Sequence, residues 1–129
     1  MERTVKIPGP DHPITVKPTA SRVVVRAGGQ VVADTTRALT LREADYPAVQ
    51  YIPRADVTEA ALRPTDTTTH CPYKGDASYF SLATADGDVA DAVWTYEAPH
   101  DAVAEIAGHV AFYPQHVELT VEDAEKAAH

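Results

Sequence analysis

The only cysteine of the 129-residue chain lies in a stretch whose other residues could make it reactive. In THCPYKGDASYF, residues 69–80, Cys71 directly follows His70 and stands three positions before Lys74. A lysine close to a thiol favours the thiolate, which is the nucleophilic form of cysteine. One hypothesis is therefore an enzyme in which Cys71 is the nucleophile, Lys74 supports it electrostatically, and His12 or His70 is the base.

The same stretch also has a purely structural interpretation. Pro72 suits the second position of a type I turn, and Gly75 can follow it with a positive φ. A lone cysteine is most often a small buried apolar side chain, and Lys74 can point into solvent. In this interpretation Cys71 is inert and the stretch is a turn between two strands.

Aromatic residues gather in the second half of the chain and could line a pocket. Tyr79 and Phe80 are predicted to point to opposite faces of one strand, whereas Trp94 and Tyr96 share a face. Tyrosine and tryptophan combine an apolar body with a polar tip, which suits the wall of a ligand pocket. The alternative is an aromatic core whose hydroxyl groups reach the rim.

No metal or cofactor motif is present in the sequence. His70 and Cys71 are adjacent, so in a strand they point to opposite faces and make a poor chelate. His109 and His116 flank a predicted turn and could approach each other, but no spacing of the six histidines matches a known metal motif. The chain also lacks G-x-S-x-G, a Walker loop and G-x-G-x-x-G. We therefore expect no metal and no cofactor.

The composition is that of one acidic globular domain covering residues 1–129. The chain is 44% hydrophobic and 23% charged, with a formal net charge of −8. It has no Lys/Arg run to neutralise phosphates, so we expect neither nucleic acid nor a membrane surface as a partner. We see no signal-peptide pattern and no stretch approaching the ~20 apolar residues of a membrane helix, so we expect a cytoplasmic protein.

The elements that must position these residues are predicted to be about eight short strands. RVVVRAGGQVVADT is predicted to be a hairpin, because two central glycines suit a turn with positive φ. No 30-residue βαβ rhythm is present, so the prediction is a mainly antiparallel β fold. The other predicted strands are residues 37–43, 49–53, 65–70, 76–84 and 89–98, with 110–114 and 117–121 pairing as a final hairpin.

One or two short helices and two irregular ends complete this prediction. Asp56 and Glu59 resemble a capping box at the start of one helix, and Asp101 is the expected cap of the other. Residues 1–21 carry four prolines and are predicted to be an extended arm, whereas residues 122–129 are predicted to be a frayed tail.

Six segments, taken in order, carry a family resemblance. They are HPITVKP, RVVVRAGGQVVADT, YIPRADV, THCPYKGDASYFSL, VWTYEAP and GHVAFYP, from about residue 8 to about 121. In this order the chain resembles domain of unknown function 427, a family of small, mostly bacterial proteins. The specific pieces are CPYKGDASY and W-x-Y-x-x-P.

The resemblance implies a β-tent-like fold, in which two antiparallel sheets meet at an angle and leave a concave pocket between them. Many β-tents carry a four-cysteine zinc clasp, which a chain with one cysteine lacks. The family has also been labelled a nucleotidyltransferase, an activity that needs clustered carboxylates to hold Mg²⁺. The nearest such cluster, Asp86, Asp88 and Asp91, spans a predicted turn and is expected to be solvated.

The resemblance also implies a site. Two cations, Arg54 and Lys74, would hold an anionic group, and aromatic side chains would form the walls around a planar part. The implied ligand-binding residues are Tyr51, Arg54, Lys74, Tyr79, Trp94 and Tyr96, and the implied catalytic residues are Cys71, Lys74 and His12.

Three hypotheses follow from these observations. The chain binds a small molecule, acts as an enzyme through Cys71, or is a structural domain that forms a homodimer through an exposed sheet edge. We favour the binding hypothesis, because walls and anchors of a pocket can be named, whereas no complete catalytic set can.

Overall fold

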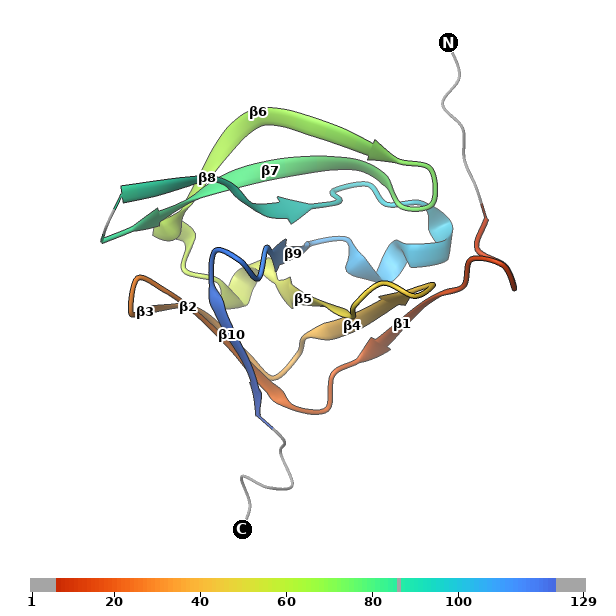
Figure 1. Ribbon diagram of the computed structural model, residues 1–129, viewed down its shortest axis with the longest axis horizontal. Coiled ribbons are helices and arrows are strands. Elements are labelled where there is room, and N and C mark those ends of the chain that lie inside the picture. Colours follow the sequence, from red (N-terminus) through yellow and green to blue (C-terminus); the bar gives the residue numbers. More distant parts are fainter. Residues whose placement is uncertain (1–6, 86, 123–129) are drawn as a thin grey trace.

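A computed structural model describes residues 7–85 and 87–122 of the chain. Its strands form a seven-stranded sheet in the order β1-β4-β5-β9-β8-β7-β6 and a three-stranded sheet in the order β10-β2-β3 (Figure 1). All strand pairs in both sheets are antiparallel. The predicted mainly β fold of two antiparallel sheets is therefore confirmed, with ten strands in the described part of the chain where about eight were expected.

The seven-stranded sheet collects strands from nearly the whole chain. Its two edges are β1 and β6, and each contains a proline, Pro18 and Pro64, which an edge strand tolerates better than a central strand. The predicted arm of residues 1–21 thus supplies an edge strand. The strands are β1 (Ile14–Pro18), β4 (Leu39–Glu43), β5 (Val49–Pro53), β6 (Leu62–Cys71), β7 (Gly75–Thr84), β8 (Gly87–Thr95) and β9 (His109–Phe112).

The three-stranded sheet contains the predicted hairpin, formed by β2 (Arg22–Ala27) and β3 (Gln30–Thr35). Gly28 and Gly29 adopt φ values of +57° and +81°, a conformation that glycine reaches without steric cost. The third strand is β10 (Glu118–Glu122), which pairs with β2.

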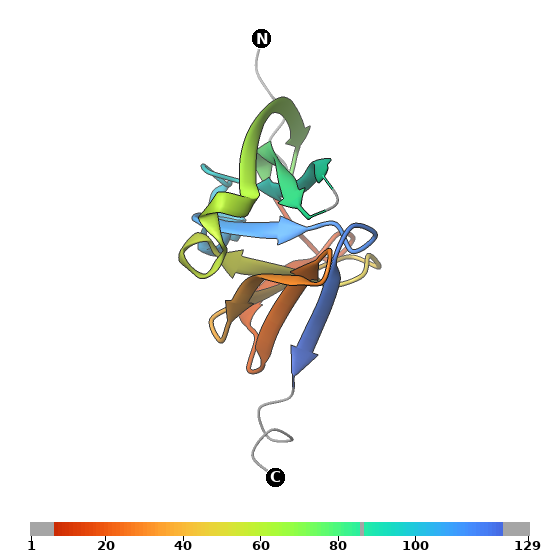
Figure 2. The ribbon, with the colours of Figure 1, turned by 90° about the vertical axis from the view of Figure 1, so that its left-hand side faces the viewer.

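The predicted hairpin between residues 110–114 and 117–121 is wrong. β9 pairs with β5 and β8 in the large sheet, and the chain then turns away so that β10 runs alongside β2 (Figure 2). Val110, Ala111 and Phe112 are all buried, so β9 needs a neighbour on each edge and cover on both faces. A partly exposed partner such as β10 cannot provide that environment.

The predicted helices are short 3₁₀ turns, and the predicted caps are wrong. The Asp56 carboxylate instead accepts a 2.6 Å hydrogen bond from the Thr35 hydroxyl, and no side-chain cap precedes the turn that begins at Asp101. These connections are too short to nucleate an α-helix, so contacts from distant residues decide their conformation. The turns are η1 (Arg54–Asp56), η2 (Glu59–Ala61) and η3 (Asp101–Ile106).

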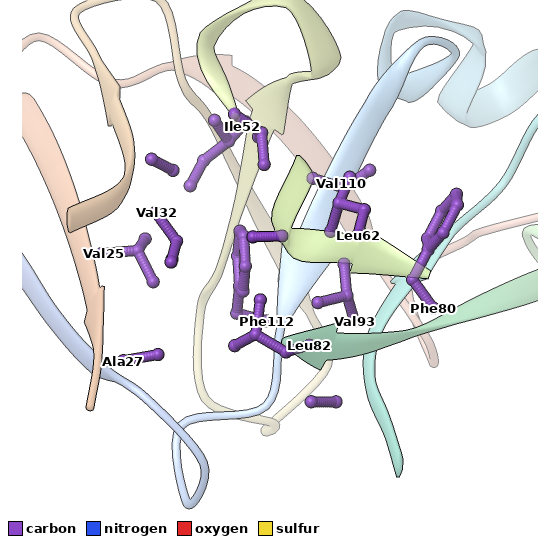
Figure 3. Close-up of a cluster of buried hydrophobic side chains, with 14 of the residues drawn as sticks. Val25, Ala27, Val32, Ile52, Leu62, Phe80, Leu82, Val93, Val110 and Phe112 are labelled. Atoms are coloured by element: carbon purple, nitrogen blue, oxygen red, sulfur yellow. The ribbon is translucent and has the colours of Figure 1, made fainter. Parts of the chain in front are cut away.

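Alternating side chains divide the core into two clusters on opposite faces of the seven-stranded sheet. Tyr51 and Ile52 of β5 belong to different clusters, and so do Tyr79 and Phe80 of β7, as the period of two predicts. The first cluster fills the space between the sheets. Figure 3 shows apolar side chains of the two sheets facing each other. The three-stranded sheet contributes Val25, Ala27 and Val32, and the large sheet contributes Leu62, Phe80, Leu82 and Val93.

The second cluster lies under η3, which contributes the buried side chains of Val103 and Ile106. We call this side of the seven-stranded sheet the η3 face. Its other fully or largely buried members are Leu41, Tyr51, Ala77, Tyr96 and Ala111. Because η3 covers only part of this face, the sheet beside it is left open to a cavity.

Candidate functional site

A cavity of about 200 Å³ opens on the η3 face of the seven-stranded sheet. Side chains from β4, β5, β7 and β8 line it, together with residues of the β4–β5 and β6–β7 turns and residues that follow β8 and β9. The resemblance placed the pocket between the two sheets, but this cavity lies on the face turned away from the three-stranded sheet. Its aromatic lining consists of Tyr46, Tyr51, Tyr79, Trp94, Tyr96 and Tyr113.

An ion pair between Lys74 and Glu43 forms one wall of the cavity. The Lys74 ammonium donates a short hydrogen bond to Glu43 Oε1, and each side chain is only 13% exposed. His12 Nε2 lies 2.7 Å from the other oxygen, Glu43 Oε2. The His12 ring is held against the ring of Tyr73, with centroids 4.1 Å apart and planes 6° from parallel. Two basic side chains therefore converge on a single carboxylate.

The surroundings of Glu43 favour its ionised form. Burial is the largest single influence and raises the pKa of the carboxyl, because it penalises the charged form. The hydrogen bonds from Lys74 and His12, together with their charges, act in the opposite direction and hold the pKa of Glu43 below its usual value. The carboxylate is therefore ionised at neutral pH although it is largely buried.

The turn at CPYKG positions Lys74. The Lys74 N–H donates to the Cys71 carbonyl at 3.2 Å, which closes the turn around Pro72, and the His100 N–H donates to the Lys74 carbonyl at 2.9 Å. Gly75 follows with φ of +115° and starts β7. Pro72 and Gly75 therefore have the turn-forming roles that the structural interpretation assigned to them.

Tyrosine and tryptophan side chains supply the hydrogen-bonding groups of the other walls. Trp94 Nε1–H donates to the Tyr51 hydroxyl at 3.2 Å, and the Trp94 ring lies 4.5 Å from that of Tyr113. The Lys74 ammonium lies 6.0 Å from the centre of the Tyr96 ring. The Tyr96 hydroxyl makes no hydrogen bond to any residue within 7–85 and 87–122. In the cavity lining it is therefore a polar group that no described residue hydrogen-bonds.

Three of the tyrosines that line the cavity, Tyr51, Tyr96 and Tyr113, have raised pKa values and keep their protons at neutral pH. Burial raises the pKa of Tyr51 to about 12, and the hydrogen bond from Trp94 opposes this rise only in part. Burial also raises the pKa of Tyr113 to about 12, with a further rise from its hydrogen bond to Tyr79. The pKa of Tyr96 rises for the same first reason. Their hydroxyl groups can therefore both donate and accept hydrogen bonds.

Five of the six residues assigned to ligand binding line this cavity, namely Tyr51, Lys74, Tyr79, Trp94 and Tyr96. Arg54 does not. Its guanidinium lies 4.7 Å over the ring of Phe80, which belongs to the cluster between the sheets, and pairs with Glu59 at 2.7 Å. Arg54 and Lys74 therefore lie toward opposite faces of the large sheet, and the two-cation clamp for an anion is not formed.

The three residues assigned to catalysis do not assemble around the thiol. Cys71 is half-buried and packs against the cluster of the η3 face, and in the described part of the chain no hydrogen bond joins its thiol to the side chain of His12 or Lys74. His70, the alternative base, has its Nδ1 2.8 Å from Asp76. His12 and Lys74 do come together, but they meet at Glu43.

Sequence reasoning missed Glu43 and Tyr113. Glu43 lies 31 residues from His12 and 31 residues from Lys74, so no local spacing connects them. Tyr113 follows β9, and its position was assigned to the hairpin that does not form. A signal for Tyr113 was available in the aromatic pair that it forms with Phe112 next to a predicted turn.

Other chemistry is not apparent in residues 7–85 and 87–122. No group of three or more His, Cys, Asp or Glu side chains there is arranged to hold a metal ion. Asp88 pairs with Arg63, and Asp91 accepts hydrogen bonds from two threonine hydroxyls, whereas Asp86 lies outside the described residues. None of the helices in those residues combines the length and apolar character needed to cross a membrane.

Comparison with known proteins gives a family but no activity. No curated protein matches the sequence. A family model described as domain of unknown function (DUF427) matches residues 15–123, a span that includes every cavity-lining residue and excludes His12. Because this match covers most of the 129 residues, the chain belongs to the DUF427 family.

Proposed function

We propose that the protein binds a small, uncharged polar molecule in the cavity of the η3 face. The observation that carries this proposal is the Lys74–Glu43 pair, largely buried yet lining an open space among tyrosine rings. A buried ion pair contributes little to stability, because desolvation of both charges offsets their attraction. Its place beside a cavity therefore supports a role in recognition.

The arrangement of donors and acceptors supports a ligand that carries both a donor and an acceptor. The Lys74 ammonium has three N–H donors and gives one to Glu43, while the Glu43 oxygens keep lone pairs beyond those used by Lys74 and His12. A ligand group with a donor beside an acceptor, such as a primary amide, can accept a hydrogen bond from Lys74 and donate one to Glu43. The Tyr96 hydroxyl, to which no described residue hydrogen-bonds, adds a third polar contact.

The charge of the site supports an uncharged ligand. The resemblance implied an anionic group held by Arg54 and Lys74, but Arg54 packs on Phe80, away from the cavity. Lys74 is neutralised by Glu43, so an incoming anion would meet a carboxylate as well as an ammonium. The cavity volume of about 200 Å³ equals several water molecules at ~30 Å³ each, which suits a ligand the size of one ring with one polar group.

Benzamide and benzoate form a matched pair of probes for this proposal. They share a planar ring and differ in whether the polar group is neutral or anionic. The chain has one tryptophan, so its indole N–H signal in a proton–nitrogen NMR spectrum belongs to Trp94, which lines the cavity. We expect benzamide to shift this signal saturably and benzoate to bind at least about tenfold more weakly, a difference of about 1.4 kcal/mol.

Two variants locate the binding. Lys74→Met removes the donor and should weaken benzamide binding about tenfold or more, whereas Arg54→Ala alters a cation outside the cavity and should leave it unchanged. Tyr79→Phe, which keeps the ring, is the second variant if Lys74→Met does not fold. Tighter binding of benzoate would show that the ligand is anionic. Absence of saturable shifts with either probe would refute the binding proposal.

A further inference from the structure

A second, larger space adjoins the cavity. This groove has a volume of about 580 Å³ and shares four lining residues with the cavity, namely Tyr46, Pro47, Val49 and Trp94. Its volume falls within the range of small-molecule sites. The two spaces therefore meet along a common wall, with Trp94 lining both of them.

The groove is apolar where the cavity is polar. Five of the six residues that line only the groove are apolar: Ala48, Phe112, Pro114, Val117 and Leu119. The sixth is Gln50, whose side-chain amide is already engaged. Its oxygen accepts a hydrogen bond from Thr19 at 2.7 Å, and its nitrogen donates to Thr40 at 3.1 Å. The groove therefore offers a mainly apolar surface, and the Gln50 amide in it is already hydrogen-bonded to two threonines.

The strand pairing explains how a space on one face reaches residues on the other. β5 and β9 pair at only two positions, Ile52 with Val110 and Pro53 with His109. Continuation of this register would pair Gln50 with Phe112, but the two strands diverge there, and both residues line the groove. The chain beyond β9 then turns toward the three-stranded sheet (Figure 2). Trp94, which packs against the cluster of the η3 face, and Phe112, of the cluster between the sheets, therefore line the same groove.

From this geometry we infer that the cavity and the groove form one cleft, and that the ligand has an apolar arm. Resting on the proposed function, this inference places the polar end of the molecule at Lys74 and Glu43 and its alkyl or aryl arm past Trp94, against Phe112, Val117 and Leu119. The ligand class is thus an amphipathic small molecule, longer than the cavity alone can enclose. Two observations support an amphipathic ligand: the cavity and the groove share lining residues, and the cavity is polar where the groove is apolar.

A series of unbranched amides tests the inference. Acetamide, butanamide and hexanamide share one polar group and differ in chain length, and the Trp94 indole signal reports their binding. Each methylene that enters the groove should lower Kd roughly two- to fourfold, as expected for burial of apolar surface. In Ala48→Phe, an added ring fills the groove from an exposed position, so acetamide should bind as before and the gain with length should disappear.

The outcomes separate this inference from the proposed function. If all the amides bind with equal affinity and benzamide still binds, the inference of an apolar arm is wrong, while the proposed function stands. A gain with length that persists in Ala48→Phe, and in Val117→Asn as a second groove variant, would overturn the groove as its location. Failure of every amide, benzamide included, would refute the proposed function itself. A dimer in light scattering that Ala48→Phe converts to monomer would show that a second copy occupies the groove.

Discussion

Replacement of Glu43 by glutamine tests whether the pair with Lys74 is a buried electrostatic unit. Both side chains are 13% exposed, so water screens them far less than a surface pair. Loss of one partner costs about 3–5 kcal/mol for a fully buried pair, whereas a surface pair contributes about 0–1 kcal/mol. We expect Glu43→Gln to lower the free energy of unfolding by about 2–3 kcal/mol, because the pair is mostly but not wholly buried.

A double-mutant cycle isolates the interaction itself. Urea unfolding of the wild type, Glu43→Gln, Lys74→Met and the double variant can be followed by the fluorescence of the single tryptophan. We expect the double variant to be more stable than the sum of the single losses predicts, with an interaction energy of about 2 kcal/mol. Asp34→Asn is a control, because Asp34 pairs with Arg22 while both side chains remain about half exposed, so its loss should be much smaller.

The pH dependence has a definite sign. The pKa of Glu43 is lower in the folded protein than its ordinary value of 4.5, because the bonds from Lys74 and His12 together outweigh the opposing effect of burial. A lowered pKa gives stability that is complete above the unfolded value and is lost as pH falls through the folded value. The difference between wild type and Glu43→Gln should therefore be largest near neutral pH and shrink below about pH 4.5.

Additive single losses would refute this reasoning. An interaction energy within about 0.5 kcal/mol of zero is what independent sites show. That result, or a loss in Glu43→Gln no larger than in Asp34→Asn, would mean that Glu43 and Lys74 are screened like surface charges. The cavity would then lack the polar anchor on which the proposed function rests.

Three further predictions concern the turn, the second cation and the tyrosines. Gly75→Ala should lower the free energy of unfolding by about 1–3 kcal/mol, because a residue with a side chain is strained at φ of +115°. Gly9→Ala is the control: an added Cβ there meets open space, so the free energy of unfolding should change by less than about 0.5 kcal/mol. Equal effects of the two substitutions would contradict the turn geometry. Arg54→Ala should lower the free energy of urea unfolding by at most about 1 kcal/mol, because the ion pair of Arg54 with Glu59 is exposed. A larger loss would mean that the contact of Arg54 with the Phe80 ring stabilises the fold more than the ion pair does. Tyr51 and Tyr113 should ionise near pH 12 in an ultraviolet titration. Because both pKa values are raised on folding, the stability that these residues contribute should be lost as pH rises from about 10 toward 12. A single transition of all six tyrosines near pH 10 would contradict this prediction.

Local patterns predicted the strands but not all of their partners. The alternation of Tyr79 and Phe80 predicted opposite faces, and the two glycines of the β2–β3 hairpin predicted its turn, because both features depend on a few consecutive residues. The pairing of β9 and β10 was predicted incorrectly, since proximity in sequence does not decide which sheet a strand joins. The expected cap at Asp56 failed for a related reason, because Thr35, 21 residues away, takes up its carboxylate.

The candidate site divides in the same way. The sequence by itself determined that Trp94 and Tyr96 share a face and that CPYKG forms a turn, because strand alternation and turn chemistry act over a few residues. Only the tertiary structure decided that Lys74 meets Glu43 and that Arg54 faces away, because these partners come from separate elements. Side-chain periodicity ends where a strand ends. The long-range packing of the sheet therefore decides that Lys74, and not Arg54, lines the cavity.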